Sequence, residues 1–109
     1  MAMVVERFAV YLVNLDAHPS KDAKNTRPGV VISPNELNRN LENVIIAPLS
    51  STKLNYPTRV PVDFLNDNRF VILDQIRAVD KLRLVKKIGE IEESSQAALI
   101  ERLLEMFAK

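Results

Sequence analysis

The side chains that most often carry enzyme chemistry are scarce in this chain of 109 residues, which has no cysteine and a single histidine, His18. Without cysteine there can be no disulfide, thiolate metal site, iron–sulfur cluster or cysteine nucleophile. A single histidine excludes a two-histidine acid–base pair within one chain and a metal site built from several histidines. Candidate groups must therefore come from arginine, lysine, hydroxyl, amide and carboxylate side chains.

Two polar segments bring such groups next to predicted strands. Residues 16–25 contain Pro19 and no apolar periodicity, and a loop of that length in a compact domain is often functional. Arg27 follows this loop at the entrance to the next strand, where a rigid element can position it. The segment 50–53 is rich in hydroxyl groups and follows another apolar run.

Short strands must position these loops. The continuous apolar run 8–13 predicts a central strand covered on both faces. Further strands are predicted over the ranges 29–32, 44–47, 58–62, 70–73, 76–79 and 85–88. Pro48 is expected to mark an edge or an end of the third strand, because proline cannot donate a backbone hydrogen bond.

Local signals predict the turns between the strands. Ser33, Pro34 and Glu36 have the spacing of a capping box, which predicts a short helical turn. The segment 66–68 (Asn-Asp-Asn) predicts a turn between strands, and Asp80 is suited to cap another.

The last segment differs in kind, because its apolar residues fall at helical spacing. It predicts an amphipathic helix that starts near residues 92–95, with Glu101, Arg102 and Glu105 on the polar face. The apolar face would consist of Ala97, Ile100, Leu103, Leu104 and Phe107. Several short strands followed by a helix predict a mainly β (α+β) fold, a small curved antiparallel sheet or partly open barrel packed by a terminal helix.

Composition bounds the remaining possibilities. The length predicts one domain over residues 1–109, and a core this small makes oligomerisation plausible. The formal net charge of +1 does not indicate a nucleic-acid binder by bulk charge, so any such site must be local. Bases cluster at 77–87 and acids at 90–105, which we interpret as two solvated faces that attract each other. No signal peptide or membrane segment is apparent, which predicts a cytoplasmic protein.

Five blocks, in order and spacing, resemble the MazF/PemK-type toxin endoribonucleases, or mRNA interferases. They are 11–16 (YLVNLD), 27–32 (RPGVVI), 44–50 (VIIAPLS), 57–60 (PTRV) and 73–80 (LDQIRAVD). The resemblance runs from about Arg7 to the C-terminus. Its most specific parts are the Asp-Gln-Ile-Arg block and the Arg-Pro pair after the long loop.

The resemblance implies an SH3-like twisted β-barrel of the MazF/PemK/CcdB type, acting as a homodimer. It implies sequence-specific cleavage of single-stranded RNA without a metal or a small-molecule cofactor. The products would be a 2′,3′-cyclic phosphate and a 5′-hydroxyl. A cognate antitoxin, acidic and partly disordered, would bind the dimer and block the RNA groove.

Cleavage of this kind needs a proton acceptor for the 2′-hydroxyl, stabilisation of charge on the phosphoryl oxygens, and help for the departing 5′-oxygen. By resemblance, Arg27 is the catalytic arginine, and its fork of donors suits two phosphoryl oxygens. Ser50 lies where the family carries Thr or Ser and can donate a further hydrogen bond. Asp74 is either the base or an anchor for a neighbouring loop, and Asp22 is a second candidate base.

The RNA groove would be lined by residues of the two loops and of the Asp-Gln block. The predicted RNA-binding residues are Lys21, Lys24, Asn25, Thr26, Ser51, Thr52, Lys53, Gln75 and Arg77. Lysines attract phosphates, while amides and hydroxyls can read the base edges of a splayed strand. His18 lies three positions before the site of a PemK-branch histidine and is interpreted as a bystander.

The chain departs from the family pattern at three places. Arg7-Phe8-Ala9 stands where Arg-Gly followed by an acid is usual, the loop 16–26 lacks glycine, and Ile72 replaces an arginine found in some PemK-branch proteins. Two alternatives therefore stay open. One is a degenerate toxin that binds RNA or antitoxin without cutting. The other is a CcdB-like gyrase poison, although the absence of tryptophan near the C-terminus argues against it.

Overall fold

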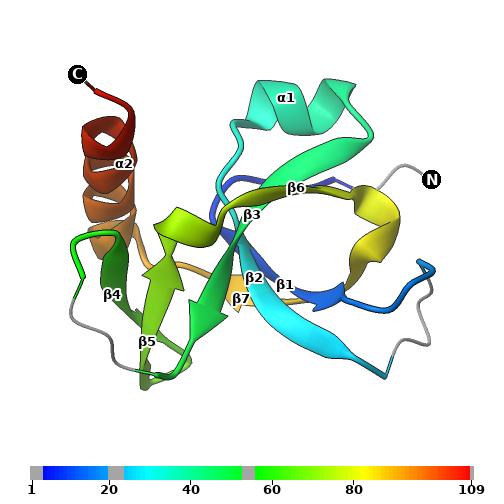
Figure 1. Cartoon of the computed structure of the whole chain (residues 1–109), viewed down its shortest axis with the longest axis horizontal. Helices are drawn as coiled ribbons and strands as arrows, with labels where there is room; N and C mark the ends of the chain where they lie inside the picture. Colours follow the sequence, from blue (N-terminus) through cyan, green and yellow to red (C-terminus); the bar gives the residue numbers. More distant parts are fainter. Residues whose placement is uncertain (1–3, 20–23, 53–55, 109) are drawn as a thin grey trace.

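The computed structural model describes residues 4–19, 24–52 and 56–108, and a curled antiparallel sheet forms most of it (Figure 1). Its seven strands follow the order β4-β5-β3-β2-β1-β7, with β6 paired to β3. The strands are β1 (Ala9–Asn14), β2 (Thr26–Val31), β3 (Asn43–Ser50), β4 (Arg59–Phe64), β5 (Asp67–Ile72), β6 (Arg77–Asp80) and β7 (Leu84–Glu90). The helices are α1 (Asn35–Asn40) and α2 (Glu93–Phe107), with 3-10 turns η1 (Leu73–Gln75) and η2 (Lys81–Arg83). The mainly β fold with a terminal helix was predicted correctly.

The central strand β3 joins the two halves of the curl. One edge of β3 pairs with β2, whereas the other pairs first with β6 at 43–46 and then with β5 at 49–50. Pro48 lies between those two segments, inside the strand. The expectation that Pro48 ends the strand or marks an edge is therefore wrong. The proline is tolerated where β3 exchanges one partner for another.

Two apolar clusters lie against the sheet. One contains Val10, Val30, Leu73 and Leu99, and the other contains Val13, Val44 and Leu84 among others. Neighbouring residues of β1 enter different clusters, as the unbroken apolar run of that strand predicted.

Helix α2 packs beside β4 at one end of the sheet (Figure 1). Its buried residue is Leu99, with Leu103 and Met106 partly buried against the same cluster. Leu104 and Phe107 are 67% and 71% exposed. The helix was predicted correctly, but its buried face is rotated from the predicted apolar stripe.

The predicted capping box at α1 does not form. Pro34 is the N-cap and no side chain caps the helix. Ser33 is buried instead: its hydroxyl donates to Asn38 Oδ1 and accepts the amide of Ile45 at 3.0 Å. The hydroxyl that would cap the helix therefore satisfies buried groups of β3 and α1.

The other turn signals are closer to the structure. Asp80 Oδ1 accepts the amide of Leu82 at 2.8 Å and caps η2, as predicted. The β4–β5 hairpin turns at Leu65 and Asn66, both with positive φ (50° and 64°), one residue before the predicted segment. Phe8 also has positive φ, 72°, at the position where the family pattern has glycine. A glycine would adopt this backbone without steric cost.

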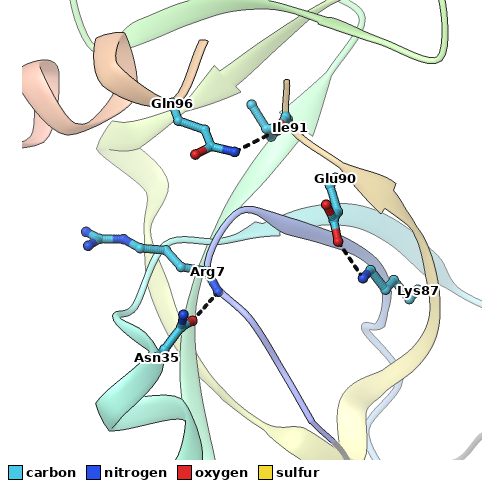
Figure 2. Close-up of polar contacts among 6 residues, drawn as sticks. All are labelled: Arg7, Asn35, Lys87, Glu90, Ile91 and Gln96. Atoms are coloured by element: carbon cyan, nitrogen blue, oxygen red, sulfur yellow. Dashed lines mark hydrogen bonds and ion pairs between the residues drawn. The ribbon is translucent and has the colours of Figure 1, made fainter. Parts of the chain in front are cut away.

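Polar contacts join the segment before β1 and the first turn of α2 to neighbouring elements (Figure 2). The amide of Arg7 donates to Asn35 Oδ1 at 2.7 Å, so the segment before β1 is held against α1. Gln96 Nε2 donates to the carbonyl of Ile91 at 3.0 Å, which joins the first turn of α2 to the end of β7. Within the described ranges, no helix is long and apolar enough to cross a membrane.

Candidate active site

A cavity of about 750 Å³ opens over β2 and β3, next to the ends of β1 and β5. Its wall combines polar side chains with an apolar floor. The lining residues are Val13, Leu15, Arg27, Pro28, Ile46, Pro48, Leu49, Ser50, Ser51, Arg69, Ile72, Gln75 and Arg77. Both leading candidates from the sequence, Arg27 and Ser50, therefore share one cavity.

Strand register explains why Arg27 and Ser50 face the same space. In the antiparallel β2–β3 pair, Gly29 lies opposite Pro48. Continued two residues further, the same register sets Arg27 opposite Ser50. Side chains two residues apart on a strand lie on the same face, so both residues share the face of the Gly29–Pro48 pair. Glycine at 29 leaves this face open: a Cβ there would lie 3.1 Å from the side chains of Val13 and Ile46.

Arg27 offers an uncompensated positive charge. Its backbone is fixed within β2 by pairing with Val13 of β1, while its side chain is exposed. Nη1 makes a long hydrogen bond of 3.4 Å to the carbonyl of Thr26. Among the described residues, no carboxylate lies at ion-pair distance from Arg27. Its guanidinium fork is therefore available to an anion such as a phosphate.

The Ser50 hydroxyl is oriented by the backbone that follows it. Ser50 Oγ accepts the amide of Thr52 at 3.1 Å, and the side chain is half-buried at the end of β3. Accepting that bond occupies a lone pair and leaves the hydroxyl hydrogen for another acceptor. The residue can thus donate into the cavity from a fixed position.

The cavity wall is cationic. Three arginines line it (Arg27, Arg69 and Arg77), and the lining includes no Asp or Glu from the part of the chain that the structure describes. Arg69 makes an ion pair of 3.3 Å with Asp67, which lies two residues before it on β5. A wall of this charge attracts a polyanion, and the apolar floor offers a surface on which a base can pack.

Asp74 is engaged beside this cavity rather than within its lining. Its Oδ1 accepts the hydroxyl of Thr58 at 2.8 Å, and its Oδ2 lies 3.4 Å from Arg59 Nη2. The Thr58 hydrogen bond, with a smaller contribution from Arg59, holds the pKa of Asp74 below its ordinary value. A carboxylate with a lowered pKa is a weak base, so this arrangement favours the anchoring role over the proton-accepting one.

Comparisons with known proteins identify relatives of this chain. The profile of the PemK-like, MazF-like toxins of type II toxin–antitoxin systems matches residues 6–107. Endoribonuclease EndoA of Bacillus subtilis (strain 168) is 31% identical over 108 residues, which cover 93% of this chain and 92% of EndoA.

The chain belongs to the PemK-like, MazF-like toxin family.

Solved structures of the family share the fold. Toxin MazF-mt6 of Mycobacterium tuberculosis aligns with a TM-score of 0.74 and 26% identity, covering 91% of this chain and 95% of that toxin. An endoribonuclease from a mycobacterial species, solved with its cognate antitoxin, aligns with a TM-score of 0.79 at 22% identity and covers 93% and 92% of the two chains. The predicted MazF/PemK membership and its fold are thus confirmed.

The predicted site residues fall into three groups in this PemK/MazF-like chain. Arg27, Ser50, Ser51, Gln75 and Arg77 come together in the cavity wall. Lys24, Asn25, Thr26 and Thr52 adjoin the cavity in sequence but are outside the lining set. Lys21, Asp22 and Lys53 lie outside the described residues. His18 has an exposed side chain, and its backbone carbonyl accepts a hydrogen bond from Asn14 Nδ2 at 3.1 Å.

Sequence reasoning missed Arg69. It lies on β5, two residues before Val71, which pairs with Leu49 of β3. Alternation along the strand could have placed Arg69 on one face of β5. It could not have shown that β5 adjoins the end of β3 where Ser50 lies. The missing information is the partner exchange of β3 at Pro48. Within the described ranges, no three His, Asp or Glu side chains gather as a metal site would require.

Replacing Asp74 with asparagine should leave RNA cleavage within about tenfold of the wild-type rate, because the amide oxygen can still accept from Thr58. Loss of a general base typically costs about 10²–10⁴-fold. Single-turnover cleavage of a long unstructured RNA distinguishes the two roles. A loss beyond about 10²-fold would mean that Asp74 is the base.

The same substitution should alter acid stability. The folded-state pKa of Asp74 is lowered, so its carboxylate stabilises the fold above about pH 4 and loses that contribution as the pH falls further. The Asp74→Asn variant should therefore show a weaker decline of stability below pH 4 in denaturant titrations. An unchanged pH dependence would show that the Thr58–Asp74–Arg59 contacts do not stabilise the fold.

Proposed function

We propose that this chain is an endoribonuclease toxin that cuts single-stranded RNA, including mRNA, at specific short sequences without a metal ion. The observation that carries the proposal is that Arg27 and Ser50 line the same cationic cavity. Family membership supports it, since the relative EndoA is named an endoribonuclease. A CcdB-like gyrase poison would not need this pair of groups.

The reaction that these groups suit is attack of the RNA 2′-hydroxyl on the adjacent phosphorus. A bond forms between the 2′-oxygen and phosphorus, the bond from phosphorus to the 5′-oxygen breaks, and a 2′,3′-cyclic phosphate remains. Negative charge accumulates on the non-bridging oxygens as the new bond forms. Arg27 would bind those oxygens through two parallel hydrogen bonds, and the Ser50 hydroxyl would donate a third.

Proton transfer is the second requirement. The described residues of the cavity wall include no carboxylate and no histidine, and Asp74 is held by Thr58 and Arg59. Asp22, in the loop between β1 and β2, is therefore our candidate acceptor for the 2′-hydroxyl proton. A guanidinium holds its protons tightly, so the main role of Arg27 is charge stabilisation. Its second role is to protonate the departing 5′-oxygen, which leaves as the 5′-hydroxyl.

The rest of the wall would hold the RNA strand. Arg77 attracts a flanking phosphate, while Gln75 and Ser51 present groups that can read base edges. Lys24, Asn25, Thr26 and Thr52, with Lys21 and Lys53, are proposed to extend this surface. A second cavity, of about 840 Å³, shares Ser51 with the first and includes Tyr56 and Phe70 in its wall. It gives the strand a path beyond the cleaved linkage.

Partners follow from the same proposal. The protein would act as a homodimer in the cytoplasm, where mRNA is available, and a cognate antitoxin would neutralise it. A mycobacterial endoribonuclease of this fold has been solved with its cognate antitoxin, which supports that expectation. An acidic antitoxin segment is suited to cover a cavity lined by three arginines.

The purified protein should cleave a long unstructured RNA in the presence of EDTA and leave DNA of the same sequence intact. Each cut should leave a 2′,3′-cyclic phosphate on the upstream fragment and a 5′-hydroxyl on the downstream fragment, as read by phosphatase and kinase treatment before sequencing. A requirement for Mg²⁺, or products with 5′-phosphates, would overturn the mechanism. Intact RNA would leave a degenerate toxin that binds without cutting.

A further inference from the structure

Arg83, which is not among the residues lining the cavity, binds the start of the loop between β1 and β2. Its Nη1 donates to the carbonyls of Asn14 at 3.2 Å and Asp16 at 2.6 Å. Its Nη2 lies 3.4 Å from the carbonyl of Ala17. One guanidinium thus binds three backbone carbonyls, one at the last residue of β1 and two in the segment that follows it, using the planar fork that lysine lacks.

The same loop segment is closed from inside. The Asn14 side chain is fully buried; its Oδ1 accepts the amide of Asp16 at 2.6 Å and its Nδ2 donates to the carbonyl of His18 at 3.1 Å. The amide of Leu15 donates to the carbonyl of Asn25 at 2.8 Å, which joins the two ends of the loop. Hydrogen bonds within the loop therefore fix its base, and Arg83 adds further hydrogen bonds to the backbone there.

Arg83 is itself positioned by the segment that follows the Asp-Gln block. Asp80 caps η2, and the amide of Lys81 donates to the carbonyl of Glu42 at 2.9 Å. Strand β6, which begins at Arg77, leads directly from the cavity wall into η2. Residues 78–82 separate Arg77 of the cavity wall from Arg83, and β3 pairs with the first three of them.

We propose that Arg83 is a positioning residue for the nuclease site, acting through the loop between β1 and β2. Leu15 and Val13 line the cavity, and Val13 pairs with Arg27 while Asn14 pairs with Thr26. A shift at Asn14 and Leu15 would therefore displace Arg27 relative to Ser50. This inference rests on the proposed function, because positioning is meaningful only if the cavity cleaves RNA.

Charge and geometry make different predictions for Arg83. If its role were to attract RNA, Arg83→Lys would retain it and any loss in Arg83→Met would be recovered at low salt. If its role is to hold three carbonyls, lysine replaces the fork poorly and low salt does not help. The positioning role also predicts a loss mainly in kcat, since the cationic wall that binds RNA is intact.

The test compares Arg83→Met, Arg83→Lys and the control Lys86→Met, which removes an exposed charge from the neighbouring strand β7. We expect kcat for RNA cleavage to fall by about ten- to a hundredfold in both Arg83 variants, with KM changed by less than about threefold. Lys86→Met should keep kcat. Wild-type kcat in Arg83→Lys, or recovery of Arg83→Met at low salt, would overturn the positioning role.

An arm without RNA keeps the inference separate from the proposed function. In Arg83→Met, hydrogen exchange of the Leu15 and Asp16 amides should accelerate about tenfold or more, while exchange at the core residue Val30 stays unchanged. Unchanged exchange at Leu15 and Asp16 would overturn the inference even in an active enzyme. If the wild-type protein cleaved no RNA while Arg83→Met still showed the faster exchange, the proposed function would be refuted, and the contacts of Arg83 with the loop would stand.

Discussion

Arg27→Ala is expected to reduce single-turnover RNA cleavage by about 10³-fold or more. The guanidinium contacts no carboxylate among the described residues and lines the cavity opposite Ser50, so phosphate is its natural partner. Arginine groups that stabilise a phosphoryl transition state are worth about 10³–10⁵ in rate. Alanine removes both the charge and the two parallel donors. Cleavage of an unstructured RNA in EDTA, with enzyme in excess, measures the loss at the chemical step.

Folding should survive this substitution, because the Arg27 side chain is exposed and its backbone remains paired with Val13. Arg27→Lys should recover part of the rate, since a point charge without the fork binds one oxygen less precisely. The matched control is Arg102→Ala. Arg102 lies on α2, pairs with Glu105 and is not among the residues that line the cavity. Cleavage by Arg27→Ala within about tenfold of wild type would remove Arg27 from the mechanism.

Ser50→Ala carries the second large effect, a loss of about 10²–10³-fold in kcat. Removing one preorganised donor to a developing oxyanion typically costs this much. The Thr52 amide fixes the Ser50 oxygen, so the donor is oriented before RNA arrives. Ser50→Thr keeps the hydroxyl and should retain most of the activity. The comparison is made by single-turnover cleavage under the conditions used for Arg27.

Ser94→Ala, at an exposed position on α2, is the matched serine control and should cleave as wild type does. If Ser50→Ala also kept the wild-type rate, the Ser50 hydroxyl would be a turn-forming group only. If Ser50→Thr lost as much activity as Ser50→Ala, we would conclude that the site is too closely packed to accept the extra methyl group of the threonine that other family members carry.

Local pattern sufficed for most of the fold. The apolar run of 8–13 and the alternation of 58–62 each predict a strand, because burial on two faces or one leaves a direct trace in residue type. Asp80 as a cap also follows from neighbouring residues alone. These elements depend on contacts within a few residues or on burial averaged over the whole sheet.

The errors arose where distant partners decide the structure. Pro48 lies within β3 because the strand changes neighbours there, and nothing beside Pro48 in sequence shows that β6 and β5 share one edge. Ser33 bonds across to Ile45 instead of capping α1. On α2, two apolar stripes compete, and only the packing against β4 selects Leu99 over Leu104.

The candidate site shows the same division. Arg27 and Ser50 were chosen by resemblance, and their opposition depends on the β2–β3 register, which the sequence does not display. The sequence leaves Asp74 open as base or anchor, and the contacts of its two oxygens with Thr58 and Arg59 favour the anchor. Arg83 was counted as part of a basic cluster, although it bonds to a carbonyl 69 residues away in sequence.

We infer that Arg27 and Ser50 act on the same phosphodiester. A crystal structure with single-stranded RNA whose 2′-hydroxyls are methylated, and which therefore cannot be cut, tests it most directly. We expect Arg27 Nη and Ser50 Oγ to lie within about 3.2 Å of non-bridging oxygens of the same phosphate, with Arg77 on a neighbouring linkage. RNA bound with Arg27 and Ser50 on different phosphates, or outside the cavity, would contradict it.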